Sequence, residues 1–276
     1  MRQRDFVIPV ALLSVITVFF VVQLRETNKS RPRRGATTDS AATLAPQGTA
    51  ADSALAVVAA DTAALATDSA SDVRVQRSNR AAPPVDTPYV RELIREGSPG
   101  TYLRDLLAQQ QNMLMRWPDR FSAMRVFIDR DVSLPDWDPQ YPAVAERAFE
   151  EWQQAGFPLR FDMILQASDV DIRIKWIDRF PEDAGQKIGM AEKVRDQHGW
   201  LISAEITVAT HDTRGQPLPP TLIAGTVRHE VGHALGLGHS GNAADVMYPE
   251  SRTPAISSAD RKTLRLLYLL PPGRMP

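Results

Sequence analysis

The stretch "HEVGHALGLGHS", residues 229–240, contains three of the five histidines of the chain. His229 and His233 are four positions apart. On a helix they therefore lie on one face, one turn apart, where both imidazoles can reach one ion at about 2.0 to 2.1 Å. Glu230 lies one position round the helix and can face a ligand of that ion. The spacing predicts a metal site on a helix.

The third histidine requires this helix to end early. His239 follows His233 by six positions, and a continuing helix would not bring it back to the same point. Gly236 can adopt the left-handed conformation that ends a helix, and Gly238 is expected to add slack so that His239 returns to the ion. Three protein ligands and one open position are typical of a catalytic zinc.

These residues predict a hydrolytic reaction. Three neutral imidazoles leave a bound Zn²⁺ with its full charge, which lowers the pKa of a coordinated water towards about 7. Glu230 is the expected general base, which would accept the water proton and later protonate the departing amine. We expect a zinc-dependent endopeptidase that cleaves peptide bonds of proteins with one catalytic Zn²⁺ and no covalent intermediate.

The extended spacing H-E-x-x-H-x-x-G-x-x-H resembles that of the metzincin metalloproteases. Ser240 directly after the third histidine, Met247 and the run "DVMYP" are similar to the matrixin branch, and the resemblance covers about residues 116–270. It implies that Met247 lies in a tight turn beneath the zinc, although an ordinary core position would also suit this side chain.

The resemblance also implies a fold, an α/β (α+β) domain of the metzincin zincin type. This fold has a twisted five-stranded mixed sheet, an active-site helix and a C-terminal helix. Substrate would lie extended along an edge strand, which chain order assigns to residues 187–194. The expected substrate-binding residues are Gly189, Met190, Ala191 and Pro249.

The chain departs from the family in several respects. It has no cysteine, which excludes disulfides, thiolate zinc sites and the family's cysteine-based latency. His198 and His211 are the histidines left outside the motif; we expect them in exposed loops and predict no second zinc site. Ser251 stands where matrixins carry a tyrosine that lines the S1′ pocket, so the resemblance does not settle the side-chain preference.

Calcium is common in the family, but the acidic residues in question, Asp178, Glu182 and Asp183, lack a recognisable ligand spacing. Solvated charges are the better expectation for this loop. A calcium ion therefore stays allowed by the resemblance and unsupported by the residues.

Hydrophobic periodicity predicts five strands and three helices in the domain. Strands are expected at residues 124–129, 159–165, 169–177, 187–194 and 200–209. Helices are expected at residues 141–156, 221–235 and 258–270, the last opened by a capping box between Ser257 and Asp260.

Residues 89–117 are predicted as a helical extension before the catalytic domain, residues 118–276. Apolar residues at helical spacing begin after Ser98 and Pro99, a plausible helix start. Two roles are open for this extension: packing on the domain, or lying across the cleft as a pro-segment.

The N-terminal region is expected to be an anchor and a tether. After a short tail, residues 1–5, residues 6–24 carry no charge and would span about 28 Å as a helix, which favours a transmembrane signal-anchor. Residues 25–88 are rich in Ala, Thr, Ser and Asp and are predicted to be a flexible linker. A cleaved signal peptide, and thus a secreted protein, is the alternative.

The location of the domain is expected to be extracytoplasmic, either periplasmic or at the cell surface. Five basic residues follow the proposed span and conflict with this orientation under the positive-inside rule: Arg25, Lys29, Arg31, Arg33 and Arg34. A net charge of −1 argues against nucleic acid as a partner.

Two other functions stay open. The first is a catalytically silent zinc-containing domain that binds extended peptides, and the second treats the histidines as core residues without a metal. The sequence indicates no oligomeric state.

Overall fold

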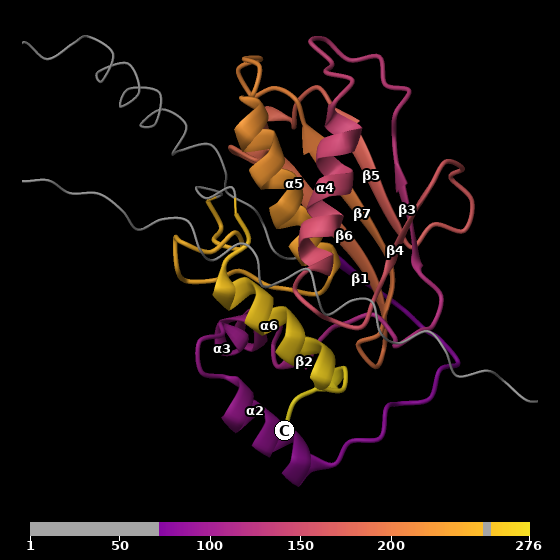
Figure 1. The fold of residues 1–276 in the computed structure, drawn as a ribbon, viewed down its shortest axis with the longest axis vertical. Coiled ribbons are helices and arrows are strands. Elements are labelled where there is room, and N and C mark those ends of the chain that lie inside the picture. Colours follow the sequence, from indigo (N-terminus) through magenta and orange to yellow (C-terminus); the bar gives the residue numbers. More distant parts are fainter. Residues whose placement is uncertain (1–71, 251–254) are drawn as a thin grey trace, which may run out of the picture. The chain divides into compact units, whose positions relative to one another are not determined.

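A computed structural model describes residues 72–250 and 255–276 of the chain (Figure 1). The predicted tail at residues 1–5, the anchor at residues 6–24, most of the linker and Ser251 lie outside these residues. Within the described part, no helix is both long enough and apolar enough to cross a membrane.

A six-stranded sheet forms the centre of the domain, in the order β1-β6-β7-β5-β3-β4. β6 runs antiparallel to β7, and every other neighbouring pair is parallel. The bounds are β1 Val73–Gln76, β3 Met124–Ile128, β4 Phe161–Ile164, β5 Ile172–Ile177, β6 Gly189–Asp196 and β7 Leu201–Ala209. The α/β class, the mixed sheet and all five predicted strands are confirmed.

The sixth strand, β1, corrects two predictions: a sheet of five strands and a structureless linker up to residue 88. β1 pairs in parallel with Lys193–Asp196 of β6, and only Val73 of its four residues is partly buried. The Ser78 hydroxyl then donates to Asp196 Oδ2 at 2.9 Å. β1 is held by backbone pairing and polar contacts rather than by buried apolar surface. The composition of the sequence therefore did not predict this strand.

Two helices, α4 (Tyr141–Gln153) and α5 (Pro220–Ala234), lie side by side on one face of the sheet (Figure 1). Arg228 binds Glu151 through Nε and Nη2 at 2.5 and 2.8 Å, and the Trp152 indole N–H donates to the Arg228 carbonyl at 2.9 Å. Alternate residues of β3 and β5 are buried beneath these helices, as the period of two predicts. α5, which carries the histidine motif, therefore packs against both α4 and the sheet.

The C-terminal helix α6, Ser258–Leu269, begins where the sequence predicts it. The Ser257 hydroxyl accepts from the Asp260 N–H, and the Asp260 carboxylate accepts from the Ser257 N–H. The capping box is confirmed.

The N-terminal extension is not one helix. It forms α2 (Thr87–Gly97), α3 (Leu103–Gln109) and a short strand β2 (Met113–Leu114) paired with β8 (Gly273–Arg274). A short 3-10 helix, η2 (Glu182–Ala184), lies farther along the chain. α2 ends at Gly97 with Ser98 as its C-cap, because Pro99 has no N–H to continue the helical hydrogen bonds. The next helix begins only at Leu103, so the predicted start at Ser98 is wrong.

The extension packs on α6 rather than standing apart (Figure 1). The Tyr102 hydroxyl donates to Asp260 Oδ1 at 3.0 Å, and the Tyr102 N–H donates to Thr263 Oγ1 at 3.1 Å. Tyr102, Leu103 and Leu106 are buried in the common core. The extension thus packs on the domain, which is the first of the two roles left open by the sequence.

Tyr102→Phe is expected to lower the free energy of unfolding by about 1.5 to 3 kcal/mol at neutral pH, because buried Asp260 loses a donor. Burial, and then the charge of Asp260, raise the pKa of Tyr102 well above its ordinary value of 10.0. The unfolded chain releases this proton first, so the stabilisation is complete below about pH 10 and is lost as the pH rises further. In urea titrations above about pH 10, the variant should therefore lose stability less steeply than the wild type.

Tyr89→Phe is the matched control, because it removes a phenol from a residue that is 60% exposed. It should change neither the stability at neutral pH nor the alkaline slope. Wild-type stability of Tyr102→Phe at neutral pH would contradict the role given to its bond with Asp260.

Candidate metal centre

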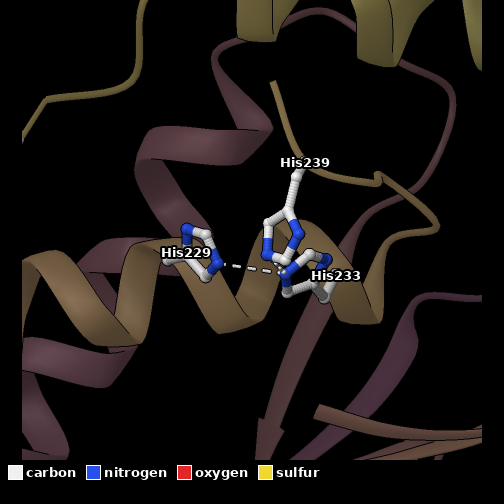
Figure 2. A group of neighbouring side chains, drawn as sticks. All are labelled: His229, His233 and His239. Carbon is white, nitrogen blue, oxygen red and sulfur yellow. Dashed lines mark hydrogen bonds between the residues drawn. The ribbon is translucent and has the colours of Figure 1, made fainter. Parts of the chain in front are cut away.

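Three imidazoles converge on one point (Figure 2). His229 and His233 project from α5, whereas His239 reaches the same point from the loop after the helix. His233 Nε2 lies 3.0 Å from His229 Nε2 and 3.2 Å from His239 Nε2, and all three residues are buried. The structure thus brings together the three predicted ligands.

Two of the histidines form hydrogen bonds through Nδ1, on the side of the ring away from the cluster, and these bonds fix the orientation of the rings. His229 Nδ1 lies 2.7 Å from the Val246 carbonyl, and His233 Nδ1 lies 2.9 Å from the Leu237 carbonyl. A carbonyl can only accept, so in the neutral rings Nδ1 carries the proton and Nε2 turns its lone pair to the centre.

This donor set fits a zinc ion. Two nitrogens bound tetrahedrally at about 2.0 to 2.1 Å from one zinc lie roughly 3.3 Å apart, close to the two separations observed. Lone pairs that face one another at such distances repel, and a bound cation turns that repulsion into ligation. His229, His233 and His239 could therefore hold one Zn²⁺.

The end of α5 sets up this convergence. Gly236 has φ +106°, its N–H donates to the His233 carbonyl, and the Leu237 N–H donates to the Gly232 carbonyl. This pair of bonds is a Schellman motif, so the predicted helix end at Gly236 is confirmed.

Met247 lies beneath α5 in a turn that closes on the histidine loop. The Ser240 N–H donates to the Met247 carbonyl at 2.8 Å, and the Met247 side chain is fully buried. A Cβ on Gly232 would lie 2.3 Å from Met247 Sδ and 3.0 Å from Trp152 Cζ2. The absence of a side chain at Gly232 lets the methionine pack directly against the helix turn between the first two histidines.

Residues 135–269 match the family model described as Matrixin. The chain carries a matrixin-like domain. "Metalloendoproteinase 1-MMP" of Arabidopsis thaliana is 30% identical over 116 residues, which cover 40% of this chain and 31% of that protein. "Metalloendoproteinase 1" of Glycine max is 28% identical over 149 residues, which cover 50% of this chain and 48% of that protein. The chain thus spans less than half the length of either relative.

Glu230 lies on α5, and the predicted substrate-binding residues lie on β6 and at Pro249. Glu230 is buried on α5, and its carboxylate lies so close to the first residue of β6 that a Cβ on Gly189 would be 2.4 Å from its Oε1. Met190 and Ala191 follow on β6, while Pro249 is half-buried just before the gap in the described residues. β6, the strand predicted as the sheet edge, thus lies beside the glutamate, but β1 covers its second half from Lys193 onward, so the edge prediction holds only for Gly189–Glu192 among the described residues.

His211 corrects the prediction of two exposed loop histidines. It is only 4% exposed, with Nε2 3.2 Å from Asp136 Oδ2 and Nδ1 2.9 Å from Asp178 Oδ1. The Thr210 and His211 N–H groups both donate to the Asp178 carbonyl, which continues the pairing of β7 with β5 and draws His211 inward. His198 is half-buried in the turn between β6 and β7.

The acidic loop is solvated only in part, because Asp178 also contacts the buried His211. Asp178 accepts from Arg179 Nε at 2.8 Å, and Glu182 and Asp183 are exposed on η2. Calcium therefore remains without support from the residues.

Sequence reasoning missed the residues that support the ligands of the matrixin-like domain from outside the motif. Asp260, identified only as part of a capping box, also accepts from the Val246 N–H at 2.9 Å. Val246 is the residue whose carbonyl orients His229. Gln109 contacts His239 from α3. No motif spacing signals such contacts, because the partners are far apart in the chain.

Gly232→Ala should lower the free energy of unfolding by about 1 to 3 kcal/mol, since overlap with Met247 and Trp152 outweighs the better helix propensity of alanine. The measurement is urea unfolding with and without Met247→Ala. Because the smaller side chain makes room, the cost of Gly232→Ala should be smaller in the Met247→Ala background.

Gly241→Ala provides the control, as its Cβ would lie an ordinary 3.5 Å from Asp105 Oδ2. This substitution should shift stability by less than about 0.5 kcal/mol. Equal costs of Gly232→Ala in both backgrounds would show that Met247 is not the neighbour that limits this position.

Proposed function

We propose that the chain is a zinc-dependent endopeptidase that hydrolyses peptide bonds of proteins. The observation that carries the proposal is the convergence of His229, His233 and His239 next to the buried carboxylate of Glu230. The matrixin match and the names of the two plant metalloendoproteinases support the same class.

The three histidines would hold Zn²⁺ through Nε2 and leave one position open, as in catalytic zinc sites. When bound, the ion supplies Lewis acidity, which makes a water more acidic and polarises a carbonyl group. The Nδ1 bonds of His229 and His233 to backbone carbonyls keep these rings oriented and make them better donors.

Glu230 would act as the general base. It adjoins His229 on α5, where its carboxylate can accept a proton from the attacking water. The protonated carboxyl group can then pass that proton to the departing amine, so the proton balance closes without a second acid. Burial beside Gly189 limits the movement of the side chain between these two steps.

The substrate would be an extended peptide lying along β6. Gly189, Met190 and Ala191 pair with β7 on one side, and among the described residues β1 pairs with β6 only from Lys193 onward. The half of the strand edge beside Glu230 is thus available for backbone pairing, a common mode of peptide recognition. Pro249 would contribute to the wall of the site.

We also propose that the domain works outside the cytoplasm, held to a membrane by residues 6–24. The support is the uncharged stretch in the sequence. Removal of the N-terminal segment would give a secreted enzyme instead.

Glu230→Gln and Glu230→Ala in the full chain should each lower kcat/KM for casein cleavage by about 10² to 10⁴-fold, because the general base is lost. Both variants should keep one zinc per chain, since the three histidines are intact. Zinc content by elemental analysis and a chelator-reversible cleavage assay provide the two measurements.

Glu150→Gln is the matched control, a carboxylate exposed on α4, and it should cleave like the wild type. Full activity of Glu230→Ala would rule out the proposed base. One zinc per chain without cleavage by the wild type would favour the alternative, a silent peptide-binding domain.

A further inference from the structure

We propose that Gln109, in the N-terminal extension, is a positioning residue for His239. The extension then helps to hold the third metal ligand in place. The inference rests on the proposed function in one respect, that the bound ion is zinc. Gln109 lies outside residues 135–269, the part of the chain that matches the matrixin family model.

The side-chain amide of Gln109 makes a two-point contact with the backbone of His239. Gln109 Oε1 accepts from the His239 N–H at 2.7 Å, and Gln109 Nε2 donates to the His239 carbonyl at 2.9 Å. Both polar backbone groups of the third ligand are thus bonded to one side chain from 130 residues earlier in the chain. Such a paired contact fixes both the orientation of the backbone at His239 and its distance from Gln109.

His239 needs this support more than the other two ligands do. His229 and His233 are fixed by the hydrogen bonds of α5, whereas His239 lies beyond the helix end (Figure 2). On either side of it, the Leu237 N–H bonds to the Gly232 carbonyl and the Ser240 N–H bonds to the Met247 carbonyl. The buried backbone of His239 lies between these two anchors and finds its partners on Gln109.

The chain holds Gln109 firmly at this place. It is the last residue of α3, whose Leu103 and Leu106 are buried and whose first turn is tied to α6 through Tyr102. A Cβ on Gly238 would lie 2.8 Å from Gln109 Oε1 and 3.4 Å from Leu106 Cα. Gly238 has no positive φ, so its role is to let α3 approach the loop, which corrects the expected role as slack.

Two further side chains of the extension contact the end of α5 and the loop after it. Gln110 Nε2 donates to the Gly236 carbonyl at 3.3 Å, and the Trp117 indole N–H donates to the Ala234 carbonyl at 2.8 Å. These are carbonyls that the helix end leaves without intrahelical partners. The extension thus supports the whole path from the end of α5 to His239.

Zinc affinity is the measurement that tests this proposal, in the full-length protein and by competition with a chromophoric chelator. Gln109→Ala should weaken zinc binding by about 10- to 100-fold, the usual effect of removing a group that orients a ligand. Gly238→Ala should weaken it in the same direction, because the new Cβ displaces the same amide. Loaded with Co²⁺, both variants should show a visible spectrum different from that of the wild type, since the spectrum reports ligand geometry.

Gln153→Ala is the matched control, because Gln153 Nε2 also donates to a backbone carbonyl, that of Leu159, at 2.6 Å. It lies outside the metal centre and should leave zinc affinity and the Co²⁺ spectrum unchanged. If Gln109→Ala does not fold, Gln109→Glu replaces it: a carboxylate of the same size keeps an acceptor for the His239 N–H and loses the donor to the carbonyl.

Wild-type zinc affinity and an unchanged Co²⁺ spectrum in both Gln109→Ala and Gly238→Ala would overturn the proposal. An equal loss of affinity in Gln153→Ala would also overturn it, because the effect would then be general destabilisation. A protein that binds zinc through Gln109-dependent geometry but does not cleave casein would refute the proposed function and leave this inference standing.

Discussion

Three nitrogen lone pairs have to meet at one point, and the rest of the domain is arranged to hold them there. Two come from a regular helix and cost little to align, because α5 places His229 and His233 one turn apart. The third must come from a chain that has left the helix. The turn at Gly236, the methionine turn under Gly232 and the carbonyls behind the rings all serve to bring His239 to the other two.

The parts of this site that are local in the sequence could be predicted from it. The four-residue spacing, the helix-ending glycine and the capping box each depend on neighbours within a few positions, so a short stretch determines them. The strands of the central sheet were also predictable, since buried and exposed residues alternate along them. Family resemblance added the place of Met247 beneath the helix.

What could not be predicted depends on contacts between distant segments. Gln109 is one of three consecutive glutamines, and only the folded position of α3 distinguishes it from its neighbours. β1 has almost no buried side chain, so hydrophobic pattern does not reveal it. His211 becomes buried because β7 extends its pairing past the last predicted strand residue, a property of two strands rather than of one.

The parallel pairing of β1 with β6 has a consequence for the size of any peptide that β6 can align. Of the eight residues of β6, Lys193–Asp196 already have a partner on the outer side. Among the described residues this leaves four positions, or about 13 Å of extended chain, on which another backbone can continue the sheet. If the proposed peptide substrate pairs with β6, β1 therefore limits that pairing to a short stretch beside Glu230.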